Sequence, residues 1–448
     1  MKRSSLSIVI IVIAMAILLI ALAISTSAQT AQTLPIKYVG VKKPGVGQVI
    51  HPQSGVQEPG DIGVRAHTNF EVFMPAGGRP EELPPYSGYG FETPASLGCI
   101  YGLVTAVSGC NPNVVATNPS GGSKSIAIVD AYDDPWAGPD LAYFSAQFGL
   151  PFKPSQLQVV YASGSQPPID ITGGWEVEES LDIEYAHAMA PSARIYLVEA
   201  DSNYFADLQT AVTVATNLVQ CGQTTTCVSI TGAGEVSMSW GGGEFSTETS
   251  YDSSFTMTNV VFFASSGDFP GTSWPCTSVN VVCVGGTSTR RNASLAFLGQ
   301  STWTEGGGGV SPYEPKPSYQ TGVTGTGTKR SVPDLSFDAN PDTGVWVWDS
   351  NYFEEAGGGW FLVGGTSLSS PSLAGIVNNA AGRSGGSFAA NSAAELTKIY
   401  TNRAVTADFA HPSFGGFCGS YEGSTATTTL GSWDPCTGIG YPKGYAGK

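Results

Sequence analysis

The sequence predicts an α/β fold, a doubly wound and mostly parallel sheet with helices on both faces. Short runs rich in Val, Ile and Tyr recur between residues 125 and 286, and most are apolar throughout rather than alternating. Such runs are typical of strands buried on both faces. Stretches with helical spacing separate the earlier runs, and a Gly-rich C-terminal third predicts many loops.

The elements follow in order along the chain. Strands are expected where apolar, β-branched residues are continuous, and helices where apolar residues recur every three or four positions. The expected strands are 125–130, 157–162, 194–200, 236–240, 260–266 and 281–286, and the expected helices are 140–150, 178–190 and 204–219.

Upstream of these elements the composition differs. A basic start, the apolar run 8–24 and a small-residue exit predict a secretory signal peptide over residues 1–28, with a retained membrane anchor as the alternative. Residues 29–93 are rich in Pro, Gly and polar residues and predict an extended leader or short pro-segment. The globular domain is expected over residues 94–448.

Charge and cysteines limit the class of protein. The chain has 20 basic and 36 acidic residues, which argues against a nucleic-acid partner because phosphates require clustered Lys and Arg. An acidic surface suits an acidic medium or simply aids solubility. Eight cysteines lie in close pairs, and after a signal peptide an even count favours disulfides. Pairing between neighbours is expected, although eight cysteines allow 105 connectivities.

Ser367 is the candidate nucleophile. It follows two small residues in GTSLSSP, and Pro371 is expected in the first turn of the helix that follows. A serine at a helix N-terminus lies where backbone N–H groups favour negative charge. The alternative is an ordinary cap on a buried helix.

Glu178 and Asp182 are the candidate acid–base pair. Four residues apart on an expected helix, they share one face, and two carboxylates in contact share a proton. A solvated acidic face is the alternative.

Together these segments resemble the sedolisin (serine-carboxyl peptidase) family of the subtilisin-like clan. Residues 175–191, WEVEESLDIEYAHAMAP, match the family's acidic segment. The resemblance implies that Glu178 is the general base for Ser367 and that Asp182 orients it. Glu176, Glu179 and Glu184 then lie off the catalytic positions, at the surface or behind the pair.

Two further segments carry the resemblance. SSGDFPG, residues 265–271, resembles the family's oxyanion loop, which implies that Asp268 donates a hydrogen bond in its protonated form at low pH. Residues 238–244, MSWGGGE, resemble the clan's edge strand that pairs with substrate. The clan's other branch needs a histidine in an HGT-like segment, and no histidine here lies in one. His187 is expected to be a core histidine.

A calcium site is implied near the C-terminus. Residues 408–409 and 430–438 resemble the family's oxygen cage, with side chains from Asp408 and Asp434 and carbonyls from Phe409, Leu430 and Ser432. The last two carbonyl positions are usually glycine in the family. The alternative is a disulfide-closed loop with surface aspartates.

The sequence thus predicts a secreted, monomeric, acid-active endopeptidase that acts on polypeptides, binds Ca²⁺ and has no membrane partner once the signal is removed. Two alternatives remain: a catalytically silent secreted binding protein on the same fold, and a histidine-dependent subtilisin-like protease. The family's long folded prodomain has no counterpart in residues 29–93, which leaves self-inhibition open.

Overall fold

The computed structural model describes residues 41–43, 47–75, 84, 90–351, 353, 357–414, 418 and 429–448. The chain divides into Met1–Tyr38, which lies outside the described residues, and Val39–Lys448, to which everything below refers. The predicted signal peptide, residues 1–28, therefore stays a prediction. No helix within the described ranges is long and apolar enough to cross a membrane.

The main sheet runs in the order β13-β12-β10-β8-β5-β7-β6, and β16 also pairs with β12. Every neighbouring pair is parallel except β12 with β13. The predicted α/β class is confirmed. The strands are β5 (Ser125–Ala131), β6 (Leu157–Tyr161), β7 (Arg194–Ala200), β8 (Gly234–Met238), β10 (Val260–Ser265), β12 (Val282–Arg291), β13 (Phe297–Thr302) and β16 (Leu335–Asp338).

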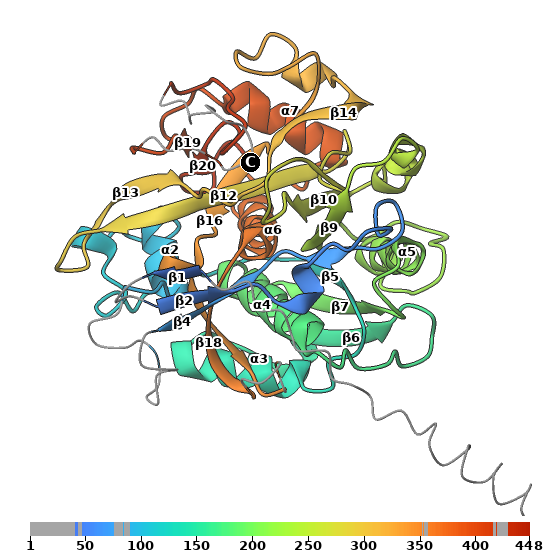
Figure 1. Cartoon of the computed structure of the whole chain (residues 1–448), viewed down its shortest axis with the longest axis horizontal. Coiled ribbons are helices and arrows are strands. Elements are labelled where there is room, and N and C mark those ends of the chain that lie inside the picture. Colours follow the sequence, from blue (N-terminus) through green and yellow to red (C-terminus); the bar gives the residue numbers. More distant parts are fainter. Residues whose placement is uncertain are drawn as a thin grey trace, which may run out of the picture. The chain divides into compact units, whose positions relative to one another are not determined.

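Helices cover both faces of this sheet, as the apolar runs predict. Along β5, Ile126 and Ile128 join one core with α4 and α6, while Ala127 and Val129 join a second core with α5. Figure 1 shows α4 and α6 beside each other near the centre of the fold and α5 on the right. The helices are α2 (Pro94–Ile100), α3 (Ala137–Phe148), α4 (Gly174–Met189), α5 (Phe205–Cys221), α6 (Thr366–Gly382) and α7 (Ser392–Asn402).

Two smaller sheets bring upstream residues into the fold. One has the order β1-β2-β4-β18-β17, and the other has the order β11-β9-β3. Their strands are β1 (Val41–Lys43), β2 (Gly47–Ile50), β3 (His67–Thr68), β4 (Glu71–Pro75), β9 (Trp240–Gly243), β11 (Ser273–Trp274), β17 (Val345–Asp349) and β18 (Gly359–Gly364). Two further pairs are β14 (Gly309–Pro315) with β15 (Lys329–Val332) and β19 (Phe409–Ala410) with β20 (Tyr441–Pro442).

These sheets extend the fold upstream of the boundary expected at residue 94. Residues 47–75, expected as part of an extended leader, supply strands on both sides of the Ser367 segment. The reason is pairing: β4 adds to β18, which ends just before Gly365, and β3 adds to β9. The glycine-rich β9 is therefore not an edge strand here, because β3 and β11 flank it.

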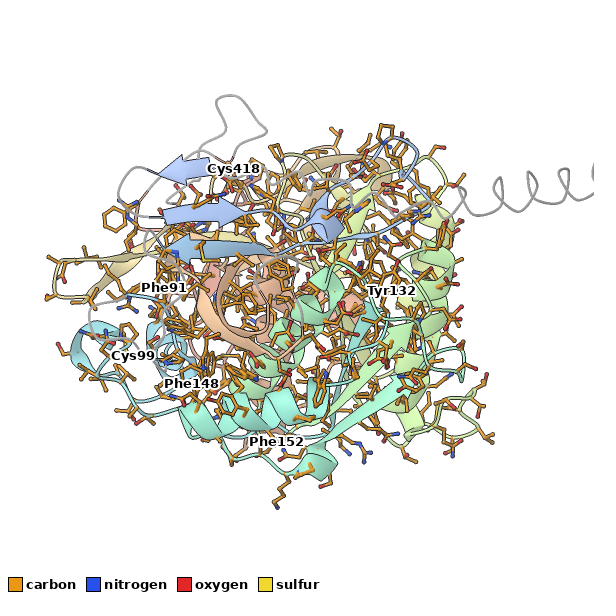
Figure 2. The ribbon with its side chains drawn as sticks, turned by 60° about the horizontal axis from the view of Figure 1, so that its bottom comes forward. Phe91, Cys99, Tyr132, Phe148, Phe152 and Cys418 are labelled. Atoms are coloured by element: carbon orange, nitrogen blue, oxygen red, sulfur yellow. A yellow bond between two sulfur atoms is a disulfide. The ribbon has the colours of Figure 1, made fainter. Side chains whose placement is uncertain are left out.

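Four disulfides join neighbouring cysteines, and the expected pairing is confirmed. The bridges are Cys99–Cys110, Cys221–Cys227, Cys276–Cys283 and Cys418–Cys436. Cys99 and Cys418 are labelled in Figure 2. Disulfides of this density are typical of proteins from oxidising compartments.

Candidate active site

Ser367 is the second residue of α6 and is fully buried. Its backbone N–H, free of helical pairing at this position, donates to the Asn69 carbonyl at 2.9 Å. Its hydroxyl donates to the Ser239 carbonyl at 3.0 Å. The helix start thus supplies one N–H and one hydroxyl, two of the groups that acyl transfer at a serine uses.

Pro371 does not lie in the first turn of α6, as expected, but in the second. Proline has no N–H to give to the carbonyl four residues before it, which is that of Ser367. Instead the Ser239 hydroxyl donates to the Ser367 carbonyl at 3.3 Å. A side chain from the segment between β8 and β9 therefore replaces the missing helical hydrogen bond.

Glu178 and Asp182 lie on α4, which packs against α6, and both are fully buried. Burial, then the charges of Asp182 and Asp130, raise the pKa of Glu178 well above its usual range, and a hydrogen bond with the Ser367 hydroxyl opposes this. Burial also raises the pKa of Asp182, opposed by hydrogen bonds with Ser239 and Glu178. Burial and mutual repulsion therefore favour a pair that keeps at least one proton.

Asp268 faces Ser367 from the loop after β10 and is 4% exposed. Its Oδ1 accepts hydrogen bonds from the Thr366 N–H at 2.7 Å and the Thr366 hydroxyl at 2.8 Å. Its Oδ2 has no hydrogen-bond partner within the described part of the chain. Burial, then the charge of Glu71, raise the pKa of Asp268 well above its usual range, so a neutral carboxyl is favoured.

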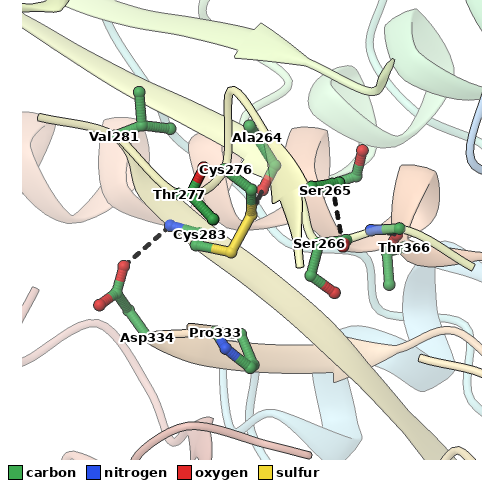
Figure 3. The surroundings of a disulfide bond; sticks show 12 residues. Ala264, Ser265, Ser266, Cys276, Thr277, Val281, Cys283, Pro333, Asp334 and Thr366 are labelled. Carbon is green, nitrogen blue, oxygen red and sulfur yellow. Dashed lines mark hydrogen bonds between the residues drawn. A yellow bond between two sulfur atoms is a disulfide. The ribbon is translucent and has the colours of Figure 1, made fainter. Parts of the chain in front are cut away.

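A disulfide lies next to the loop that carries Asp268. Cys276 and Cys283 join the segment after this loop to β12, and Cys283 N–H donates to Asp334 at 2.9 Å. Figure 3 shows this bridge below Ala264 and to the left of Ser265 and Ser266. The bridge ties the segment that follows the Asp268 loop to β12, the strand that pairs with β10.

The structure brings all four predicted catalytic residues, Glu178, Asp182, Asp268 and Ser367, to one place. Of the two placements expected for their neighbours Glu176, Glu179 and Glu184, the surface is excluded, because all three are buried. Glu184 accepts from the Trp348 N–H at 3.3 Å. The whole of α4 is buried between β5, α3 and α6, so an acidic run here does not form a solvated face.

The prediction for His187 is confirmed. The ring is fully buried and lies edge-on to Phe152 at 5.4 Å, and burial lowers its pKa to about 4. Phe152, which follows α3, is labelled in Figure 2. Each of the other three histidines lies beside an acidic side chain: His51 with Glu71, His67 with Asp61 and His411 with Asp434.

Sequence reasoning missed several polar residues around the site. Asn69 lies over the catalytic groups but falls in the segment expected to be a leader, where no pattern marked it. Asp130 follows the apolar run of β5. Because α/β folds bind ligands at the carboxyl ends of their parallel strands, a carboxylate at this position could have been recognised from the sequence as a candidate site residue. His51, Glu71 and Glu305 bring three ligating atoms within 4.8 Å of one another, the one such group that the described residues contain.

The expected calcium ligands lie near β19 and β20. Asp408 and Asp434 are 8% and 3% exposed, so neither is a surface aspartate. Asp434 accepts hydrogen bonds from the N–H groups of Cys436 and Thr437 and from the Thr437 hydroxyl. The Lys448 ammonium, whose pKa burial lowers to about 7, donates to the Asp408 carbonyl at 3.3 Å.

The donor chemistry of the five expected ligands fits a hard cation, because all are oxygens and two are buried carboxylates. The Lys448 ammonium lies beside Asp408 and would compete there with a bound metal ion.

Curated proteins with similar sequences were identified in three bacteria. Sedolisin from Pseudomonas sp. (strain 101) is 39% identical over 114 residues, 23% of this chain and 18% of that protein. Kumamolisin from Bacillus sp. (strain MN-32) is 28% identical over 367 residues, 72% and 59% of the two chains. Xanthomonalisin from Xanthomonas sp. (strain T-22) is 35% identical over 133 residues, 24% and 15%.

The chain thus spans less than two thirds of the length of each of these relatives. No family model matches it. Among solved structures, "Pseudomonas sedolisin (serine-carboxyl proteinase) complexed with two molecules of pseudo-iodotyrostatin" aligns with a TM-score of 0.59 and 24% identity. That alignment covers 79% of this chain and 95% of the other, and it establishes the likeness of fold.

Proposed function

Because the chain belongs to the sedolisin family, we propose that it is an acid-active serine-carboxyl endopeptidase. Ser367 is the nucleophile, Glu178 its general base, Asp182 the partner of that base and Asp268 the oxyanion donor. One observation carries the proposal: one residue, Asn69, gives its carbonyl to the Ser367 N–H and its own N–H to Glu178 Oε2, so the nucleophile and its base lie against the same residue.

The base works as one of a pair. A lone buried carboxyl with a raised pKa would be neutral in acid and a poor base. Two interacting carboxyls lose their protons in separate steps, and after the first loss one negative charge and one proton are shared. In that state Glu178 accepts the Ser367 proton as the hydroxyl attacks, and Asp182 retains the shared proton.

Asp268 stabilises the charge that develops on the carbonyl oxygen. Thr366 donates to Oδ1, which leaves Oδ2 as the site of the acid proton in the neutral form. A buried, neutral carboxyl donates to an oxyanion, whereas an ionised carboxylate would repel it. The mechanism therefore needs Asp268 protonated while the Glu178–Asp182 pair holds one negative charge.

Hydrolysis of an unfolded protein at pH 4 and pH 7 tests the function. The folded chain is expected to cleave faster at pH 4, Ser367→Ala to abolish cleavage, and Ser163→Ala, at an exposed serine, to leave it unchanged. Activity above a few per cent in Ser367→Ala would refute the assignment. No hydrolysis at either pH by folded, disulfide-bonded protein would favour the silent binding protein instead.

We also propose calcium binding at Asp408, Phe409, Leu430, Ser432 and Asp434, where the ion would stabilise the loop that Cys418–Cys436 closes. The substrates are polypeptides. The four disulfides support secretion, and cleavage of residues 1–28 and a monomeric state remain part of the proposal.

A further inference from the structure

Three side chains from distant parts of the chain meet beside the loop that carries Asp268. His51 follows β2, Glu71 begins β4, and Glu305 lies between β13 and β14. An imidazole nitrogen and two carboxylate oxygens, one atom from each residue, lie within 4.8 Å of one another. Bonds of about 2.0–2.2 Å to a shared metal ion would hold such atoms about 3–4 Å apart, so small rotations of the side chains would let all three reach one ion.

Glu71 is the most deeply buried member of this group. Its side chain is 1% exposed, and its Oε1 lies 2.7 Å from His51 Nδ1. Its Oε2 has no hydrogen-bond partner among the described residues. Burial of a carboxylate without enough partners is costly, and burial raises the pKa of Glu71 to about 7. Glu71 Oε2 therefore lacks a partner that a bound cation would supply.

The carboxyls of this group outnumber the cations beside them. The charge of Glu305 raises the pKa of Glu71, and the charges of both glutamates raise the pKa of Asp268. Among the side chains that the structure describes, no lysine or arginine forms an ion pair with either glutamate. Three neighbouring carboxyls and one imidazole, His51, thus favour a bound cation.

The position of His51 is fixed by two contacts. Antiparallel pairing of β2 with β4 sets His51 beside Glu71. Its ring also stacks on Phe269, with the ring centroids 5.8 Å apart. His51 and Glu305 are both partly exposed, so an ion could enter from solvent and a water could fill a further coordination position.

We propose that His51, Glu71 and Glu305 bind one zinc ion, which joins β2 and β4 to the segment between β13 and β14. An imidazole nitrogen with carboxylate oxygens is a donor set that suits zinc, whereas calcium and magnesium prefer oxygen ligands alone. The direct contact between His51 and Glu71 is replaced by a bond from each to the metal. The site shares no ligand with the proposed calcium site and takes no part in the proposed peptide hydrolysis.

Calorimetric titration of the metal-free full chain with zinc tests this site. The chain carries Ser367→Ala, so that it stays intact during the measurement, and excess calcium is present to fill the calcium site. Ligands must lose their protons to bind a metal, so the titration is done at pH 7.5 rather than in acid. We expect one zinc ion per chain. Zinc should also raise Tm by several degrees, because the ion binds the folded chain.

Variants of this parent chain locate the ion. His51→Phe can keep the ring contact with Phe269 but removes the nitrogen, and Glu305→Gln keeps the size of the side chain but removes its charge. Each should weaken zinc binding more than about 100-fold, the upper end of the loss when only an indirect partner of a ligand is removed. Glu58→Gln, at an exposed glutamate, is the matched control and should bind zinc like the parent. Asp434→Asn, which alters only the calcium site, should do the same.

The possible outcomes are distinct. A folded parent chain that binds no zinc would overturn the proposal and leave the contact between His51 and Glu71 as a simple ion pair. Zinc binding of parental strength in both His51→Phe and Glu305→Gln, with an unchanged rise in Tm, would mean that the ion binds elsewhere and would also overturn it. Calcium that displaced zinc from this site at equal concentration would refute the choice of metal. Because Ser367 is absent from the tested chain, each outcome is independent of the proposed peptidase activity.

Discussion

The oxyanion role of Asp268 makes a prediction that separates charge from geometry. Asp268→Ala removes the donor, whereas Asp268→Asn replaces Oδ2–H by an N–H in the same place. The asparagine oxygen can still accept the two hydrogen bonds from Thr366 that hold the side chain. The two variants therefore differ mainly in whether a hydrogen-bond donor remains at the Oδ2 position beside Ser367.

The expected magnitudes follow from these contacts. Loss of one oxyanion donor lowers kcat by about 10²–10³, or about 2.7–4 kcal/mol of transition-state stabilisation. Asp268→Ala should show that loss, and Asp268→Asn should stay within about tenfold of wild type. The pKa of Asp268 also fixes the direction in which activity changes with pH. Burial raises the pKa of Asp268, so the active neutral form persists above the usual carboxyl range and is lost as pH rises through the raised value.

Initial rates on a peptide substrate between pH 3 and pH 8 test this reasoning. Wild type should lose activity toward neutral pH, and Asp268→Asn should lose less, because its donor does not ionise. Asp201→Asn, at an exposed aspartate, is the matched control. The oxyanion role would be refuted if wild type and Asp268→Asn lost activity equally toward neutral pH. It would also be refuted if kcat of Asp268→Ala were within threefold of wild type.

Three further predictions follow from the same site and its surroundings. Glu178→Gln should lower kcat by about 10²–10⁴, the usual cost of losing a general base. His187→Ala should lower stability and leave kcat unchanged. A larger loss of kcat in His187→Ala than in Glu178→Gln, with both variants well folded, would favour a histidine mechanism. Buried carboxyls with raised pKa values bind protons that the unfolded chain releases above about pH 4, so the free energy of unfolding measured in urea should fall from pH 4 to pH 8. Glu184→Gln should flatten that slope, exposed Glu58→Gln should not, and a slope of opposite sign would contradict the assigned protonation. Removal of calcium should lower Tm by several degrees in wild type but not in Asp434→Asn, and an unchanged wild-type Tm in chelator would exclude the site.

The sequence predicted the sheet and singled out four side chains that the structure brings together, because both depend on local patterns. Continuous apolar runs marked strands such as β5, and the spacing of Glu178 and Asp182 placed both on one helix face. Neighbouring cysteines pair because each bridge closes a short loop. Such features need only a few consecutive residues, so they can be read without knowledge of long-range contacts.

The errors arose where distant segments meet. Residues 47–75 have no period of their own, and only pairing with β18 and β9 makes them strands. For Glu184 the sequence left both a surface position and one behind the pair open, because its partner Trp348 lies 164 residues away. Asn69 was missed for the same reason: its importance comes from Ser367, Glu178 and Ser265, all more than 100 residues further along the chain.

The proline in α6 has a consequence for how a substrate is aligned. Ser239 exchanges two hydrogen bonds with Ser367, one at 3.0 Å and one at 3.3 Å, and Ser239 directly precedes β9. Ser367 is therefore coupled to the start of β9, rather than to its own helix alone. A peptide that slipped by one residue along β9 would move its carbonyl by about 3.3 Å. In the proposed mechanism, this coupling sets the position relative to β9 of the bond that Ser367 attacks.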